Sequence, residues 1–347
     1  MVIFIAILVL GFLILVHELG HFMVAKMVGI QVDEFSIGFG PKLFGYQKRK
    51  DTTLYTIRLL PLGGYVRMAG ENPEDEDEDF VNGFNDKPLK HRFAVISAGS
   101  IMNFLVAILL IVITYGVIGI PIASNSNVIG EVVQGSPAMA AGLQSGDRII
   151  SINDVATENW EDVSGNIRKN GGQELKLVVE RDNERHLFFV KPKYDPQFEI
   201  YQIGITQSII WQRQGFFQAI RLGLNQSLQF SRLVIESLAG LIAGKYSTND
   251  VAGPVGITVA IGEAAKGGIG YLMIFAAVLG INLAIINLLP IPALDGSKLI
   301  FLTIEGLRGK PVDPEKENFI HLIGFALLMV FFILITYNDI ARIINGG

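Results

Sequence analysis

Four stretches of the chain are apolar over enough positions to cross a membrane as helices. They cover residues 2–25, 93–120, 271–289 and 319–337, and a hydrocarbon core of about 30 Å needs about 20 helical residues. A fifth stretch, residues 216–243, has polar side chains every three or four positions, which form one stripe. This pattern predicts an amphipathic helix that lies on or against the membrane and does not cross it.

Two segments between the spans have strand-like patterns. After the first span, residues 43–47 and 53–60 are β-prone runs around a polar turn, which predicts a hairpin, and residues 62–68 predict a further strand. Residues 74–79 are six consecutive acids, which is typical of a solvated loop. After the second span, residues 124–193 combine short strands, turns and helices, which predicts a soluble α+β insert.

The insert contains a motif that resembles a bacterial PDZ domain. From Ser136 to Asn153 it reads SPAMAAGLQSGDRIISIN. PDZ domains accept a peptide end beside an edge strand. The strand before the motif is therefore expected to border the peptide groove, with four candidate residues: Asn127, Val128, Ile129 and Gly130.

The composition agrees with a membrane protein that carries some soluble mass. Of 347 residues, 50% are hydrophobic and 18% charged, and the mean hydropathy is +0.44. A net charge of −5 and the lack of a basic tract argue against a nucleic-acid partner. The first span lacks the basic start and the cleavage site of a signal peptide, so we expect it to be retained.

The first span is interrupted by the sequence HELGH, which begins at His17. Ionisable groups inside a span cost about 2.5–3.5 kcal/mol each, so this cluster suggests a function. His17 and His21 are four residues apart and share one helix face, where two imidazoles can bind one metal ion. Glu18 points about 100° away and can reach a water on the metal without being a ligand. The alternative is a polar stripe packed between helices.

A catalytic zinc needs a third protein ligand. The chain has no cysteine and only five histidines, so a carboxylate is the expected candidate. Asp295 follows Pro290 and Pro292, which break the third span near its end. Such unwound backbone is tolerated at membrane depth only where protein or a water-lined cavity satisfies it. The alternative is an ordinary Leu-Asp-Gly turn at the membrane surface. The other histidines, His91, His186 and His321, are interpreted as ordinary loop or helix-end residues.

The charge distribution favours Asp295 as the partner of the two histidines. Ten basic residues lie between residues 26 and 92, which favours the cytoplasmic side for that loop and places both termini and the insert outside. If residues 216–243 do not cross, the third span runs in the same direction as the first. Asp295 then reaches the cytoplasmic leaflet that holds His17 and His21. If they did cross, Asp295 would lie on the opposite side.

Three motifs, in this order, resemble the site-2 protease family over essentially the whole chain. They are HELGH, the PDZ pattern and NLLPIPALDG, which starts at Asn287. The closest resemblance is to the bacterial regulator-of-sigma-E-type intramembrane metalloproteases. It implies Zn²⁺ held by His17, His21 and Asp295, with Glu18 as general base.

The resemblance also implies that Asn282 and Asn287 hold or orient the substrate. Hydrogen bonding between membrane helices is an equally good explanation for both. Two features depart from the family pattern. Gly296 is followed by Ser297 where many relatives have a second glycine, and there is one PDZ unit where the best-known enterobacterial members have two.

The predicted fold is a polytopic α-helical membrane protein with about four spans, a membrane-associated β element and an inserted α+β PDZ domain. The expected divisions are a first membrane half (1–120), the PDZ domain (121–195), an amphipathic region (196–268) and a second membrane half (269–347). The expected location is the bacterial cytoplasmic membrane, with the active site towards the cytoplasmic leaflet and the PDZ domain outside.

The implied activity is zinc endoproteolysis of transmembrane segments of single-pass proteins. The favoured substrate is an anti-sigma factor already trimmed outside, and remnant signal peptides are a second class. The partners are then the bilayer, these substrates and peptide ends at the PDZ domain. One alternative is a membrane-anchored PDZ scaffold with a structural or vestigial metal site. A metal-ion transporter would need polar residues in several spans, whereas residues 319–337 have only His321 near their start.

Overall fold

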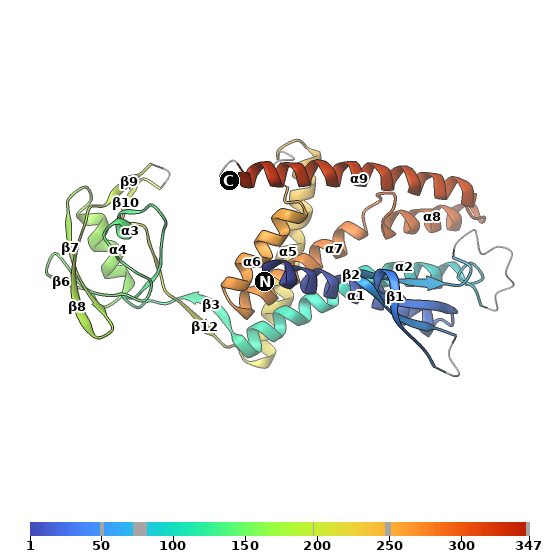
Figure 1. The fold of residues 1–347 in the computed structure, drawn as a ribbon, viewed down its shortest axis with the longest axis horizontal. Coiled ribbons are helices and arrows are strands. Elements are labelled where there is room, and N and C mark those ends of the chain that lie inside the picture. Colours follow the sequence, from blue (N-terminus) through green and yellow to red (C-terminus); the bar gives the residue numbers. More distant parts are fainter. Residues whose placement is uncertain (49–51, 72–81, 197, 247–250, 345–347) are drawn as a thin grey trace. The chain divides into compact units, whose positions relative to one another are not determined.

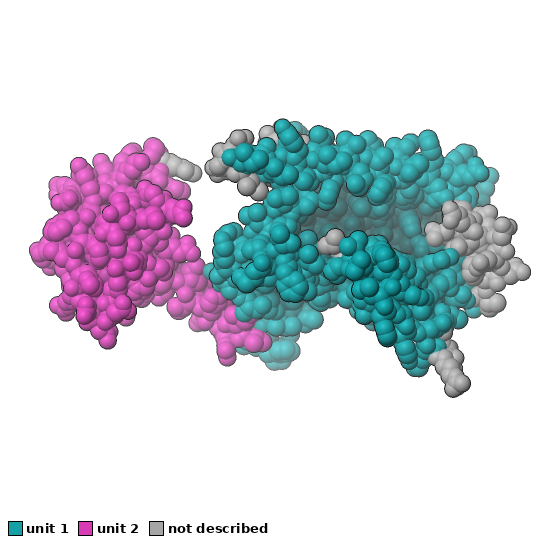
Figure 2. Space-filling view, viewed as in Figure 1, with its two compact units in different colours: residues 1–116, 215–347 teal, residues 117–214 magenta. Residues whose placement is uncertain are grey.

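The computed structural model describes residues 1–48, 52–71, 82–196, 198–246 and 251–344. The chain forms two compact units. Met1–Gly116 and Gly215–Gly347 form one, called the membrane unit below, and Val117–Gln214 form the other, called the PDZ unit (Figures 1 and 2). The acidic run at residues 74–79 lies outside the described residues.

Within the described residues, four helices are long and apolar enough to cross a membrane. They are α1 (Val2–Met27), α2 (Leu89–Ile113), α7 (Ile269–Asn287) and α9 (Pro314–Ile344). They coincide with the four predicted spans, and α5 (Phe216–Ile242) is not among them. The predicted class, a polytopic helical membrane protein with a β element and an inserted α+β unit, is confirmed.

Helix α1 packs closely against α2. A Cβ atom at Gly20 would lie 2.4 Å from the carbonyl oxygen of Ala98, so only glycine allows the two backbones to approach this closely. The other side of α1 packs against α6 (Pro254–Lys266) and α7, where Leu13 and Ile261 are fully buried. Helix α1 therefore lies among three other helices of the membrane unit.

The β element consists of two long antiparallel strands, β1 (Val32–Gln47) and β2 (Leu54–Met68). Residues 42–47 pair with residues 54–58, which is the predicted hairpin. The first part of β1 also pairs with both ends of β2, so two strands produce a sheet of four segments. The sequence did not indicate this first part as strand, because Gly38 and Gly40, both at positive φ, interrupt its pattern.

The β element contacts α1 along the face that carries Gly11 and Glu18. Pro61 approaches Gly11, where an added Cβ would lie 2.9 Å from the proline carbonyl oxygen. Two helical turns further along α1, a Cβ at Gly64 would lie 3.7 Å from Cγ of Glu18. The last segment of β2 thus runs beside the charged turn.

The PDZ unit contains a four-stranded sheet in the order β6-β5-β7-β8. Its strands are β5 (Arg148–Ile152), β6 (Val155–Ala156), β7 (Leu175–Arg181) and β8 (Glu184–Val190). Two helices cover the core, α3 (Pro137–Ala140) and α4 (Trp160–Lys169). Fully buried Ile152, Val163 and Leu177 lie in that core, in agreement with the α+β insert that the sequence predicts.

The PDZ unit ends later than the predicted boundary at residue 195. Three strand pairs involve the residues that follow: β9 (Lys193–Asp195) with β10 (Ile200–Gln202), β4 (Ile129–Val132) with β11 (Ile205–Gln207), and β3 (Ile120–Ala123) with β12 (Ile209–Gln212). Because β11 and β12 return to the first strands of the unit, the compact unit extends to Gln214.

The end of the membrane unit is attached to its beginning by ion pairs. Helix α8 (Asp295–Arg308) carries Glu305, which accepts hydrogen bonds from both terminal nitrogens of Arg92 on α2. Lys298, one turn after Asp295, donates to Glu71 at 2.6 Å. A further contact joins α9 to α6. Near the C-terminal end of α9, buried Asp339 accepts hydrogen bonds from the backbone N–H groups of Gly253 and Gly256 at the start of α6.

Asp147 of the PDZ unit provides a test of the packing of that unit. It is 1% exposed and accepts hydrogen bonds from Arg181 at 2.7 and 2.8 Å and from the N–H of Gln144 at 2.8 Å. We expect Asp147→Ala to lower the free energy of unfolding by about 2–3 kcal/mol, because it removes a buried acceptor of three hydrogen bonds, two of them from a charged group. Urea unfolding of the fragment 117–214, which has its own core, measures this change.

The matched control is Lys176→Met, which removes the exposed ion pair between Lys176 and Asp154. Exposed pairs contribute about 0–1 kcal/mol, so this variant should unfold close to the parent. Equal losses for the two variants would contradict the assignment of Asp147 as a buried structural anchor.

Candidate metal centre

Three side-chain atoms from the two ends of the chain meet in the membrane unit. His17 Nε2 lies 3.1 Å from His21 Nε2, and Asp295 Oδ2 lies 3.1 and 3.3 Å from these two nitrogens. Both histidines are buried, at 8% and 7% exposure. The structure thus brings together the three residues that the sequence suggests as metal ligands.

The tautomer of His21 indicates what can occupy this space. Its Nδ1 lies 2.8 Å from the carbonyl oxygen of Val95 and must donate to it, so Nε2 has no proton in the neutral ring. The lone pair of Nε2 therefore faces the carboxylate of Asp295. Buried Asp295 Oδ2 has no hydrogen-bond donor among the described residues. A metal ion between these atoms would compensate the facing lone pairs, and two imidazoles with one carboxylate are a ligand set that suits zinc.

Glycine at position 99 of α2 makes room for both imidazoles. A Cβ atom there would lie 2.4 Å from His21 Nε2 and 2.8 Å from His17 Nε2. The ligand nitrogens consequently lie against the bare backbone of α2. Val95, whose carbonyl holds His21, is one turn earlier on the same helix. Neither residue was identified from the sequence, because a glycine and a main-chain carbonyl in an apolar helix give no metal-site pattern.

Asp295 is the first residue of α8, after a turn that follows the end of α7. The turn is tight. A Cβ at Gly296 would lie 2.1 Å from the carbonyl oxygen of Leu289, so this position of the Leu-Asp-Gly motif requires glycine. Ala293, two residues before Asp295, has φ +76°, a left-handed conformation that is uncommon for residues with a side chain.

Lys298 supplies a positive charge near Asp295, one turn further along α8. Burial works against that charge, but the contact with Glu71 keeps the pKa of Lys298 above its ordinary value. A cation one turn away favours the ionised form of the Asp295 carboxyl group, which is the form that a metal ligand needs.

Three other residues predicted for the site, Glu18, Asn282 and Asn287, differ in how they relate to the metal centre. Glu18 is partly buried on α1 and interacts electrostatically with the three ligand residues. Asn287, the last residue of α7, has its Nδ2 3.5 Å from both ring nitrogens of His17. Asn282 is partly buried on the same helix. Five helical residues rotate its direction by about 140°, so the two asparagines do not share one face.

The peptide edge predicted in the PDZ unit is not open. Strand β4 pairs with β11 along one edge, and residues 127–129 bond to residues 146–149 along the other. Asn127 is buried and donates to the carbonyl oxygens of Ile149 and Thr157. The prediction that Asn127, Val128, Ile129 and Gly130 border a peptide groove is therefore wrong. The sequence pattern identified a strand but not its neighbours, and β11 was not recognised.

Comparisons with known proteins agree with this geometry. The family model for peptidase family M50 matches residues 5–331. Zinc metalloprotease RasP of Geobacillus kaustophilus is 36% identical, with 97% of each chain covered. Regulator of sigma-W protease RasP of Bacillus subtilis is 34% identical, again with 97% of each chain covered.

Among solved structures, the PDZ domain of the SdrC-like protein of Listeria monocytogenes matches 25% of this chain and 90% of its own. It has 22% identity and a TM-score of 0.22. The family model and the relatives cover both the HELGH turn and the Leu-Asp-Gly motif within nearly full-length matches. The chain belongs to peptidase family M50 and is a zinc metalloprotease.

Proposed function

We propose that this bacterial multi-pass membrane protein cuts transmembrane segments of other proteins at a zinc ion held by His17, His21 and Asp295. The observation that carries the proposal is the meeting of three metal-binding atoms inside a unit of apolar helices, within 4.8 Å of one another. A ligand set placed there serves a substrate that reaches it through the bilayer. A soluble peptide would have to lose its hydration to reach a site among apolar helices.

The chain's own residues have separate parts in this reaction. Zinc at the site supplies Lewis-acid polarisation of the scissile carbonyl and an acidified water. His21 holds its ligand nitrogen towards the metal because Val95 accepts its other N–H. Glu18, beside the ligands but not one of them, takes the proton of the attacking water and returns it to the leaving amine. Asn287, next to His17, can donate to a substrate carbonyl.

The β element supplies a surface for the substrate. A helical substrate hides its carbonyl groups in its own hydrogen bonds and must be extended before it is cut. The last segment of β2, residues 64–68, pairs on one side with β1 and runs beside Glu18 at Gly64. An extended substrate that adds to the sheet there would present its backbone to the metal site.

The favoured substrate is a membrane-bound anti-sigma factor already trimmed outside, with remnant signal peptides as a second class. The relative from Bacillus subtilis is named a regulator of sigma-W, and a protease regulates a sigma factor most directly by destroying the protein that holds it. In this arrangement the metal site lies towards the cytoplasmic leaflet. The PDZ unit lies outside, where it screens the trimmed end of the substrate.

The role of Glu18 is tested by Glu18→Gln, which keeps the shape of the side chain and removes its basicity. We expect cleavage of a membrane-spanning substrate to fall by about 10²–10⁴-fold while zinc remains bound, since loss of a general base has effects of this size. His17→Ala, in contrast, should lose the metal. The measurements are zinc content and cleavage rate of the purified proteins. Parent-rate cleavage by Glu18→Gln would refute its role, and cleavage that survives removal of zinc by a chelator would refute a metal-dependent reaction.

The space at Gly99 gives a second test. Gly99→Ala should weaken zinc binding by about 10–100-fold, because the new Cβ would displace both imidazoles. Gly116→Ala is the matched control, since the nearest atom there is 3.6 Å away, an ordinary contact. Zinc affinity is measured by competition with a chelator. Equal affinity in the Gly99→Ala protein and the parent would show that zinc is not held at these histidines.

The proposed topology is testable because the chain has no cysteine. Single cysteines are introduced at exposed Glu184 in the PDZ unit and exposed Lys310 between α8 and α9. A membrane-impermeant maleimide should label Glu184→Cys in intact spheroplasts and Lys310→Cys only after lysis. The reverse pattern would place the metal site in the outer leaflet and would rule out the proposed orientation.

A further inference from the structure

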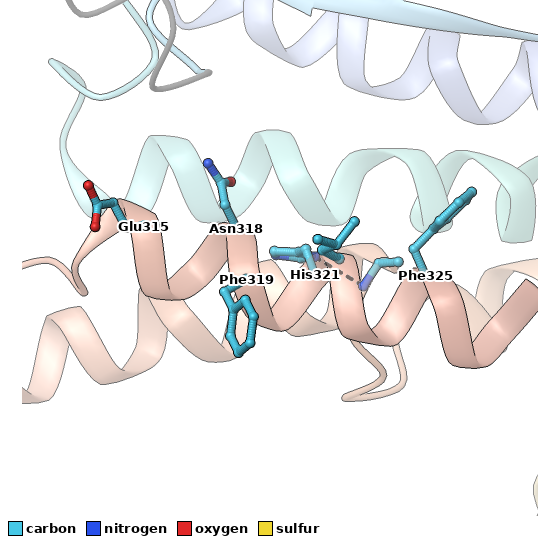
Figure 3. Close-up of a pocket in the computed structure, with 7 residues that line it drawn as sticks. Glu315, Asn318, Phe319, His321 and Phe325 are labelled. Carbon is cyan, nitrogen blue, oxygen red and sulfur yellow. Dashed lines mark hydrogen bonds between the residues drawn. The ribbon is translucent and has the colours of Figure 1, made fainter.

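The last helix contacts the turn that carries Asp295. His321 lies on α9, two turns after its start, and its Nδ1 accepts the backbone N–H of Ala293 at 3.0 Å (Figure 3). Gly324, one turn further on, lies against Pro292, where an added Cβ would be 2.2 Å from the proline Cβ. Two neighbouring residues of the turn are thus held by one face of α9.

The hydrogen bond is made to a residue in a strained conformation. Ala293 has φ +76°, which costs free energy in any residue with a Cβ. Neighbouring residues of the turn bond within it: Ile291 N–H to Leu289, and Leu294 N–H to Ile291. The N–H of Ala293 instead points out of the turn to α9. The hydrogen bond from Ala293 to His321 therefore stabilises the residue of the turn whose backbone conformation is unfavourable.

Several groups around His321 fix the orientation of its ring. Since Nδ1 accepts a hydrogen bond, the neutral ring carries its proton on Nε2, which faces the carboxylate of Glu317 at 3.8 Å. Phe301 of α8 lies 5.8 Å from the ring centre. A cavity of about 700 Å³ borders the ring, with Glu315, Asn318 and other residues of α9 along it (Figure 3). Among these α9 side chains, His321 is the one bonded to the turn.

We propose that His321 is a positioning residue for the metal site. By holding Ala293 left-handed, it fixes the direction in which the chain enters α8, and so places Asp295 Oδ2 at 3.1 and 3.3 Å from the two histidines. The last span thereby acts on the geometry of this ligand through the turn that precedes it. This inference rests on the proposed role of Asp295 as a zinc ligand.

The test compares two substitutions of His321 in the purified full-length protein. His321→Ala removes the acceptor and should weaken zinc binding by about 10–100-fold, the usual effect of losing a group that orients a ligand. His321→Asn places its Oδ1 at the branch where histidine has Nδ1, so it should bind zinc within about threefold of the parent. Leu322→Ala, which changes the next residue beside the same cavity, should also match the parent. Zinc affinity is measured by chelator competition, with cleavage rate as the second readout.

A further variant separates positioning from packing. Glycine adopts positive φ without strain, so Ala293→Gly in the His321→Ala background should recover part of the lost affinity. No recovery, or equal losses in His321→Ala and His321→Asn, would assign His321 to the packing of α9 and overturn the proposal.

Asp295→Ala distinguishes this inference from the one on which it depends. That variant should lose zinc more severely than any change at His321. If it binds zinc like the parent, Asp295 is not a ligand, and both proposals fail. If it loses zinc while His321→Ala does not, only the positioning role fails.

Discussion

The close contact between the backbones of α1 and α2 is the constraint on which the metal centre depends. Gly20 lets α1 approach Ala98, and Gly99 lets the two imidazoles of α1 rest against α2. At that distance the carbonyl of Val95 can accept the Nδ1 proton of His21. The same contact therefore creates the space for the ligands and fixes the tautomer that makes one of them a ligand. With a larger side chain at either glycine, both would be lost together.

The third ligand must come from the far end of the sequence, and several separate interactions hold it in place. Gly296 allows the turn after α7 to fold back on Leu289. The ion pairs of Glu305 with Arg92 and of Lys298 with Glu71 then fix α8 against the first half of the chain. These pairs join distant parts of the sequence and are partly buried, so they define the position of α8 more than they add stability.

The sequence predicted the parts of this centre that follow from spacing and failed on those that depend on packing. The separation of His17 and His21 places them on one helix face in any environment. The third span runs in the same direction as the first, which brings Asp295 to the side of the two histidines. Nothing in the sequence indicates that Gly99 would be the neighbour of two imidazoles, because an apolar helix with several small residues can pack against another helix through any of its faces. His321 was taken for an ordinary histidine for the same reason, since its partner is a main-chain N–H.

The strands show the same difference between local and long-range information. The pairing of residues 42–47 with residues 54–58 and the α+β character of the insert were predicted, because each pattern lies within short segments. The edge of β4 was misjudged because its occupant, β11, lies more than 70 residues later. Whether a strand has an open edge is decided by the whole fold, and alternation records only which face is buried.

Three aspartates, of which Asp147 and Asp339 are buried and Asp295 is partly buried, show how structural carboxylates differ from reactive ones in their hydrogen-bond partners. Asp147 accepts from Arg181 and a backbone N–H, and Asp339 accepts two backbone N–H groups. Both are complete within the chain, and each joins two segments. Asp295 Oδ2 meets two ring nitrogens, and the one whose protonation is fixed offers it a lone pair and no proton. Burying such an arrangement is unfavourable unless something else supplies positive charge. The chain tolerates it at one place in the described membrane unit, beside a glutamate that is not a ligand, and this is the arrangement that metal-assisted hydrolysis requires.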